Sequence, residues 1–131
     1  MKNFVFKNIL FLSIIFTAKG SETPLIDLSE RELLNIIDTI GKEIHMCVEK
    51  INRLSPNLTE DSLLQLRVML YQKINPNRAL LHDIIEQRVN NIRFIDNPVL
   101  KILSENVINQ INRVKTRIEG LCLQFTLQQQ K

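Results

Sequence analysis

Two cysteines, Cys47 and Cys122, and two histidines, His45 and His82, are the side chains of this 131-residue chain best suited to site chemistry. Neither histidine belongs to a His-Glu-x-x-His pattern, and the cysteines are too far apart in sequence for a zinc knuckle. His45 and Cys47 are two residues apart, so on a helix they face different ways. The spacing therefore predicts neither a metal site nor a catalytic histidine.

The common sequence signatures of enzymes are also missing. The chain has no Gly-rich phosphate loop, no Gly-x-Ser-x-Gly elbow and no paired-carboxylate signature. The acidic pairs Glu30/Glu32 and Glu60/Asp61 stand where helices are expected to begin, and there they interact favourably with the helix dipole. We therefore expect a protein that is not an enzyme and that uses no cofactor.

The first 20 residues have the layout of a secretory signal peptide. Two lysines precede an apolar run over residues 9–16, and Ala18 and Gly20 suit the −3 and −1 positions of a signal peptidase site. The run is too short for a good membrane span, and a retained N-terminal anchor is the alternative. We expect residues 1–20 to be a cleaved signal peptide and residues 21–131 to form a single extracellular domain without a membrane span.

Cleavage would leave an electrically neutral chain. Of the 17 basic residues, Lys2, Lys7 and Lys19 lie in the first 20 positions, whereas all 14 acidic residues lie after position 21. The mature chain therefore has 14 basic and 14 acidic residues, against a net charge of +3 for the whole sequence. Without a positive excess, nucleic acid and anionic membranes are not expected as partners.

An even number of cysteines in a small secreted protein is typical of disulfide bonding. We therefore expect a disulfide between Cys47 and Cys122, which would add about 2–4 kcal/mol to the free energy of unfolding. Two buried free thiols are the alternative.

A long amphipathic helix over residues 30–54 is the clearest element. Ser29 and Glu32 have the spacing of a capping box, which places the start of the helix. The apolar residues then step by four and three alternately, as in helices that pack lengthwise on other helices. This seam consists of Leu33, Ile37, Ile40, Ile44, Cys47, Ile51 and Leu54.

Two further helical regions are expected, over residues 59–95 and from Pro98 onwards. Pro76 interrupts the first: a proline inside a helix removes a hydrogen bond and crowds the preceding turn, whereas Asn followed by Pro can begin a new helix. Pro76 therefore either kinks one helix or separates two. In each region, apolar residues at helical spacing form a stripe that is expected to face the core. The stripes before and after Pro76 are Leu63, Leu66, Leu70 and Ile74, and Leu81, Ile85, Val89, Ile92 and Ile95; the stripe of the last helix is Leu100, Leu103, Val107, Ile111, Val114, Ile118, Leu121 and Phe125. No run predicts a strand, so the expected class is all-α.

The expected disulfide distinguishes two topologies, because its Cα atoms must lie within about 7 Å. In an antiparallel bundle of three long helices, with the middle one kinked or broken at Pro76, Cys47 and Cys122 lie near the same end. In a four-helix bundle, including the cytokine type, they lie near opposite ends, about 20 Å or more apart. We predict the three-helix bundle, with the four-helix bundle as the alternative.

Asn57-Leu58-Thr59 is an N-glycosylation sequon in an expected turn, which makes Asn57 a candidate glycosylation site. Either Asn57 or Thr59 can also cap the helix that follows.

Several apolar residues lie beside the predicted seams. The simplest interpretation is that they widen the core face of each helix. The functional interpretation is an apolar surface for a partner helix, a homodimer or a lipid-like ligand between the helices. These residues are Leu34, Ile36, Val48, Met69, Leu80, Ile84, Ile102 and Ile108.

Over residues 43–119 the chain resembles the group 5/21 mite allergens, which are secreted antiparallel bundles of three long helices. The similar segments are Glu49-Lys50-Ile51-Asn52, residues 81–88, Phe94-Ile95 and the Arg-Val-Lys-x-x-Ile-Glu rhythm of residues 113–119. The chain departs from the family in its lower charge, its cysteine pair and Pro76. The resemblance implies an extracellular protein without catalytic residues that binds apolar ligands or self-associates.

The competing hypothesis is a short helical cytokine-like protein or secreted effector that binds a receptor. The length, the signal peptide and one disulfide fit this hypothesis, whereas parallel first and last helices do not. An enclosed apolar cavity would favour a ligand carrier, and a filled core with a polar-rimmed surface patch would favour a receptor ligand.

Overall fold

The computed structural model describes residues 14–16, 22–91 and 98–129. Four α-helices dominate it: α2 (Glu30–Leu54), α3 (Glu60–Met69), α4 (Asn75–Ile84) and α5 (Pro98–Gln129). Two π-helical turns, η2 (Leu70–Ile74) and η3 (Ile85–Val89), continue the helical path, and a 3₁₀ turn, η1 (Leu25–Asp27), precedes α2. The predicted all-α class is confirmed.

Two three-residue strands, which the sequence did not predict, precede the helices. Strand β1 (Ile14–Phe16) pairs antiparallel with β2 (Glu22–Pro24), with Ile15 opposite Thr23. Because β1 lies within the segment expected to be cleaved, this pairing would belong to the precursor alone.

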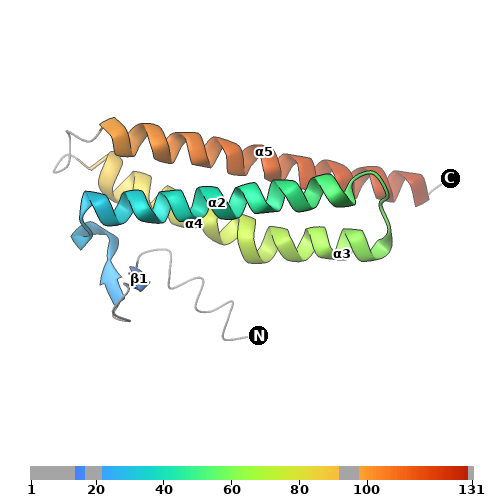
Figure 1. The fold of residues 1–131 in the computed structure, drawn as a ribbon, viewed down its shortest axis with the longest axis horizontal. Coiled ribbons are helices and arrows are strands. Elements are labelled where there is room, and N and C mark those ends of the chain that lie inside the picture. Colours follow the sequence, from blue (N-terminus) through green and yellow to red (C-terminus); the bar gives the residue numbers. More distant parts are fainter. Residues whose placement is uncertain (1–13, 17–21, 92–97, 130–131) are drawn as a thin grey trace.

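Three long helical segments make up the bundle (Figure 1). The chain runs along α2, returns through α3, η2, α4 and η3, and then follows α5 in the same direction as α2. Helix α5 contacts α2, α3 and α4. The number of long segments matches the three-helix prediction and not the four-helix alternative.

The middle segment is kinked at Pro76 rather than broken, because it stays helical from Glu60 to Val89. In η2 the N–H of Asn75 donates to the carbonyl of Leu70, five residues back. Pro76 has no N–H to complete a regular turn, and its ring would crowd the carbonyl four residues before it. The wider π turn just before Pro76 relieves this crowding. Figure 1 shows the ribbon changing direction between α3 and α4.

The π turn also changes which residues of the middle segment face the core. Its extra residue rotates the following helix relative to the regular period on which the predicted stripe was based. Leu70, Ile85 and Val89 are only partly buried, and the buried side chains include Leu63, Leu66, Met69, Ile74, Leu81, Ile84 and Arg88. The predicted stripe was therefore correct in part; its members Ile92 and Ile95 lie outside the described residues.

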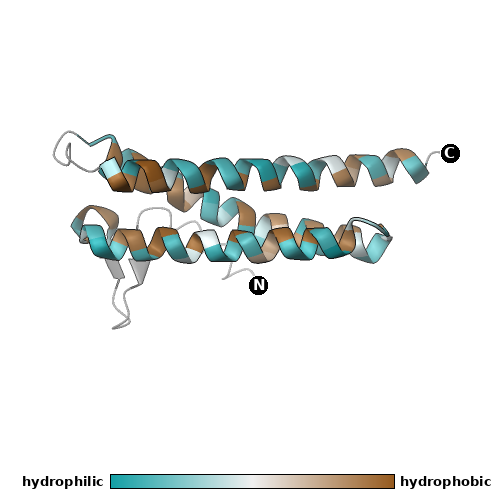
Figure 2. Cartoon of the chain, turned by 45° about the horizontal axis from the view of Figure 1, so that its top comes forward, coloured by the Kyte–Doolittle hydropathy of each residue, from teal (hydrophilic) through white to brown (hydrophobic). Residues whose placement is uncertain are grey.

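The seam of α2 is confirmed, since its first six residues are buried and Leu54 is partly buried against the core. The seam of α5 differs from the prediction: Leu103 is 40% exposed, and Ser104 and Ile108 are buried. The Ser104 hydroxyl donates to the Leu100 carbonyl at 2.6 Å, so this buried polar group is satisfied within its own helix. Figure 2 shows hydrophobic residues recurring between hydrophilic ones along both helices.

Most of the apolar residues beside the predicted seams belong to the core. Met69, Ile84 and Ile108 are buried in it. Leu34, Ile36, Val48 and Leu80 are partly buried against it. Ile102 is the exception among the eight, with 58% of its surface exposed.

The predicted capping box is present at the start of α2. The Ser29 side chain accepts from the Glu32 N–H at 3.1 Å, and Glu32 Oε1 accepts from the Ser29 N–H at 3.0 Å. The hydrogen bond that the Glu32 carboxylate accepts from the Ser29 N–H, and after it the interaction with the Ser29 hydroxyl, lower the pKa of Glu32 from its ordinary value of 4.5. The stabilisation from Glu32 is therefore fully present above about pH 4.5 and is lost as the pH falls through the lowered pKa.

We expect Ser29→Ala to lower the free energy of unfolding by about 1 kcal/mol, because one N–H of the first turn loses its acceptor. Ser55→Ala, at the other end of α2, is the matched control, since Ser55 caps the helix through its backbone. Urea unfolding at pH 7 measures both variants. Equal stabilities of the two variants would contradict this account of the cap.

Candidate functional site

The predicted disulfide is not formed: Cys47 is a buried free thiol on α2, and Cys122 is a partly buried free thiol on α5. Their positions along the bundle explain why. Gly41 of α2 lies opposite Val107 of α5, since a Cβ added to Gly41 would be 3.8 Å from a methyl group of Val107. These two residues therefore stand at the same height along the parallel helices α2 and α5. Cys122 then lies about nine residues beyond the level of Cys47, or about 13 Å at 1.5 Å per residue. A disulfide needs Cα atoms within about 7 Å.

We expect Cys47 to react much more slowly with iodoacetamide at pH 8 than Cys122. Burial raises the pKa of Cys47, and so does the charge of Glu43, while Lys73 and Lys50 act in the opposite direction. A raised pKa reduces the reactive thiolate, and burial blocks access to it. Mass spectrometry of the timed alkylation measures both rates, and denaturation should equalise them. A linked Cys47–Cys122 peptide in an unreduced digest would contradict the structure.

Asn57 lies exposed in the turn that follows α2, as the sequon predicts. Thr59, not Asn57, caps α3: its Oγ1 accepts from the Ser62 N–H at 3.1 Å. Glycosylation of Asn57 stays a prediction.

The histidines lie on separate helices and are exposed. His45 pairs with Glu49 on the next turn of α2, with 2.9 Å between Nε2 and Oε1. Within residues 14–16, 22–91 and 98–129, no group of three or more His, Cys, Asp or Glu side chains could hold a metal ion.

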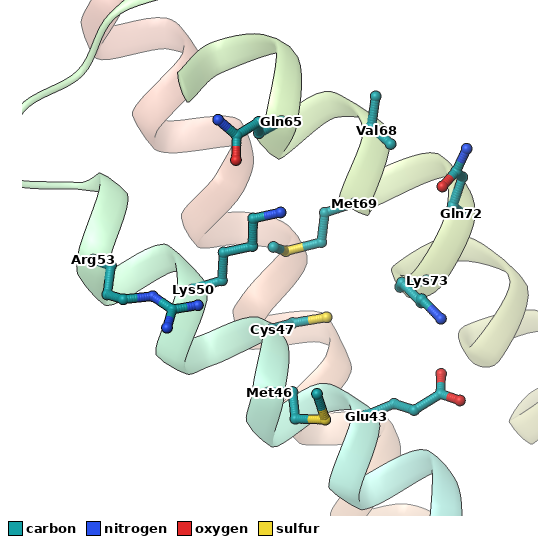
Figure 3. Close-up of a pocket in the computed structure, with 10 residues that line it drawn as sticks. All are labelled: Glu43, Met46, Cys47, Lys50, Arg53, Gln65, Val68, Met69, Gln72 and Lys73. Carbon is teal, nitrogen blue, oxygen red and sulfur yellow. The ribbon is translucent and has the colours of Figure 1, made fainter. Parts of the chain in front are cut away.

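A groove between α2 and α3 is the candidate functional site (Figure 3). Its cavity volume is about 300 Å³. Helix α2 supplies one wall, and α3 with the π turn η2 supplies the other. The groove is lined by Glu43, Met46, Cys47, Lys50, Arg53, Gln65, Val68, Met69, Gln72 and Lys73.

The floor of this groove is apolar. Cys47 and Met69 form its buried part, while Met46 is 68% and Val68 is 42% exposed. The groove is therefore open to solvent and is not the enclosed cavity expected of a ligand carrier. Thioether and thiol side chains are polarisable, and methionine adapts its shape to varied apolar partners. The floor can thus accept a small apolar group without a fixed shape.

The charges around the floor are unevenly distributed. Three cations, Lys50, Arg53 and Lys73, and one anion, Glu43, line the groove. The Glu43 carboxylate accepts a hydrogen bond from Asn77 Nδ2 at 3.0 Å. No carboxylate in the described parts of the chain forms an ion pair with any of the three cations.

Two other grooves border α2. The one between α2 and α5 is larger, about 590 Å³, but the polar side chains beside it have partners: Lys42 pairs with Asp38 at 3.0 Å, and His45 with Glu49 at 2.9 Å. The one between α2 and α4, of about 310 Å³, lies beside the Glu43–Asn77 hydrogen bond. Of the three, the α2–α3 groove alone combines an apolar floor with cations, Lys50 and Arg53 at one end, that form no ion pair with any described residue.

Arg88 is a structural residue that the sequence analysis did not single out. Its side chain is 4% exposed, and its Nη1 donates to the carbonyls of Leu25, at 3.1 Å, and Leu28. Burial lowers the pKa of Arg88, and the nearby Glu30 opposes this change. Arg88 thus attaches the segment before α2 to the end of the middle helical segment. The available signal in the sequence was an arginine one turn after the predicted core residue Ile85.

The fold and the groove define a helical bundle with a small amphipathic surface groove. Comparison of the chain with known protein families, with curated proteins and with solved structures found no match. The resemblance to the group 5/21 mite allergens therefore stays a prediction. No helix in the described part of the chain is both long and apolar enough to cross a membrane.

Proposed function

We propose that this chain is a secreted, non-enzymatic protein, folded as an antiparallel bundle of three helices, that binds a small apolar ligand in the α2–α3 groove. The apolar floor of that groove carries the proposal. Because the groove is open and is not the enclosed cavity expected of a carrier, the ligand would lie against the floor with one side in water. Its volume of about 300 Å³ is at the lower end of the range for ligand pockets, about 300–1,000 Å³. The signal peptide expected at residues 1–20 supports secretion. The mite-allergen resemblance implies either the binding of apolar ligands or self-association.

A fluorescent fatty acid analogue, dansylaminoundecanoic acid, tests this proposal on the purified secreted protein. We expect saturable binding with one site per chain and a blue-shifted emission. Val68→Gln, in the groove, should weaken binding about five-fold, because part of the apolar contact area is lost. Leu64→Gln is the matched control, since Leu64 is exposed on the same helix outside the groove.

Binding that does not saturate would overturn the proposal. So would equal effects of the two substitutions, because the ligand would then not lie in the α2–α3 groove. Far-ultraviolet circular dichroism of both variants verifies that they are folded.

Self-association is a second candidate function, favoured by exposed apolar residues on α5. Val99, Ile102 and Leu103 are 51%, 58% and 40% exposed, and Leu103 borders the α2–α5 groove. A second copy of the chain could cover this face, since exposed apolar patches often mark interfaces. Sedimentation velocity should then show a concentration-dependent dimer that Ile102→Lys dissociates. A monomer at all concentrations would overturn this candidate function.

A further inference from the structure

The two ends of the α2–α3 groove differ in charge (Figure 3). At one end Glu43 accepts its hydrogen bond from Asn77 and points toward Lys73 across the groove. At the other end Lys50 and Arg53 lie about one helical turn apart on α2, with no acidic residue among the groove-lining side chains beside them. The Lys50–Arg53 end is therefore the positive end of the groove.

Lys50 also lies against the apolar floor. Figure 3 shows its side chain extending from α2 toward α3 and ending beside Met69. The residue is only partly exposed, so less water surrounds it than surrounds a lysine on an open helix face. An anion close to such a cation is screened less than it would be in bulk water. Lys50 also acts electrostatically on the floor, since its charge opposes the rise in the pKa of Cys47.

An apolar floor that continues into a positive end has the chemistry of a molecule with one apolar chain and one anionic head. The planar guanidinium of Arg53 can hold a carboxylate through two parallel hydrogen bonds, and Lys50 can add a compact positive charge. The groove volume of about 300 Å³ suits a single short chain. Glu43, at the other end, would repel a second anionic group.

We propose that the ligand of the α2–α3 groove is a free, single-chain anionic amphiphile of the medium-chain carboxylate class. Its head group lies between Lys50 and Arg53, and its chain covers Met46, Cys47 and Met69. This inference rests on the proposed function and adds to it the charge and the orientation of the ligand.

Isothermal titration calorimetry tests the inference with three probes that share a ten-carbon chain: decanoate and decyltrimethylammonium below their micelle concentrations, and decanol below its solubility limit. We expect decanoate to bind about ten-fold more tightly than decanol, and the cation to bind most weakly. Lys50→Gln and Arg53→Gln should each weaken decanoate binding about five-fold and leave decanol binding unchanged. Adding 0.5 M NaCl should weaken the binding of decanoate alone.

Lys42→Gln is the matched control, because it removes the same charge from α2 on the side of the α2–α5 groove. Its binding of all three probes should equal that of the unaltered protein. Equal affinities for decanoate and decanol would overturn this inference and leave apolar binding in place, whereas no binding of either probe would overturn the proposed function as well. A decanoate preference that survives Lys50→Gln and Arg53→Gln but is lost in Lys42→Gln would overturn the placement of the head group.

Discussion

Replacing Arg88 with methionine is expected to lower the free energy of unfolding by about 2–4 kcal/mol. Arg88 is 4% exposed and donates to the carbonyls of Leu25 and Leu28. Methionine can fill much of the same space but donates no hydrogen bond, so both carbonyls lose a charged donor. The segment from Pro24 to Leu28 should detach from the bundle more often as a result.

Urea unfolding, followed by circular dichroism at pH 7, measures this effect. Arg67→Met is the matched control, since Arg67 is exposed on α3 in the same helical segment; its change should stay within about 0.5 kcal/mol. Limited proteolysis should cut the Arg88→Met variant first near residues 24–28. A variant as stable as the control would show that Arg88 does not hold this segment.

Leu66→Ala is expected to cost about 2–5 kcal/mol of stability, because it removes three carbon atoms from a filled part of the core. Leu66 is 0% exposed on α3 and belongs to the cluster of buried residues that the three segments share. This loss of stability has two parts. Less apolar surface is removed from water on folding, and a cavity is left in the core.

Leu64→Ala, the same substitution two residues earlier, is the control. Leu64 is 59% exposed, so its replacement should change stability by no more than about 0.5 kcal/mol. Denaturant unfolding of each variant gives both changes in the free energy of unfolding, from the shift in the midpoint when the slope m is unchanged. If the two substitutions cost the same, the face of α3 that packs on the bundle has been assigned wrongly.

Local signals predicted α2 well. The capping box of Ser29 and Glu32 depends on residues three apart, and the seam from Leu33 to Leu54 follows a regular helical period. Both can be recognised without knowing what the helix packs against. The confirmed bounds, Glu30–Leu54, reflect this.

Features that depend on how helices meet were predicted less well. In the sequence, a kink and a break at Pro76 look alike. The π turn before Pro76 decides between them, and beside it Met69 is buried in the core in place of the predicted Leu70. The disulfide prediction failed because helix direction says nothing about axial stagger. Cys47 and Cys122 lie on parallel helices. Because Gly41 lies opposite Val107, the two cysteines are separated along the helix axes by more than the distance that a disulfide can bridge.

The candidate site was missed for a similar reason. Neither Lys50 nor Arg53 was assigned a role from the sequence, and Met69 was placed only as an apolar residue beside a seam. Their common groove exists only because α3 packs beside this part of α2. The pair of cations one turn apart, next to the seam residue Cys47, was the only signal in the sequence.

A nuclear magnetic resonance titration with decanoate, followed through the methyl resonances, tests whether the α2–α3 groove is the ligand site. We expect saturable shifts at Met46, Val68 and Met69, and none at Val99 or Ile102 on α5. Shifts confined to α5 and the α2–α5 groove, or no saturable shift at any methyl group, would contradict this expectation.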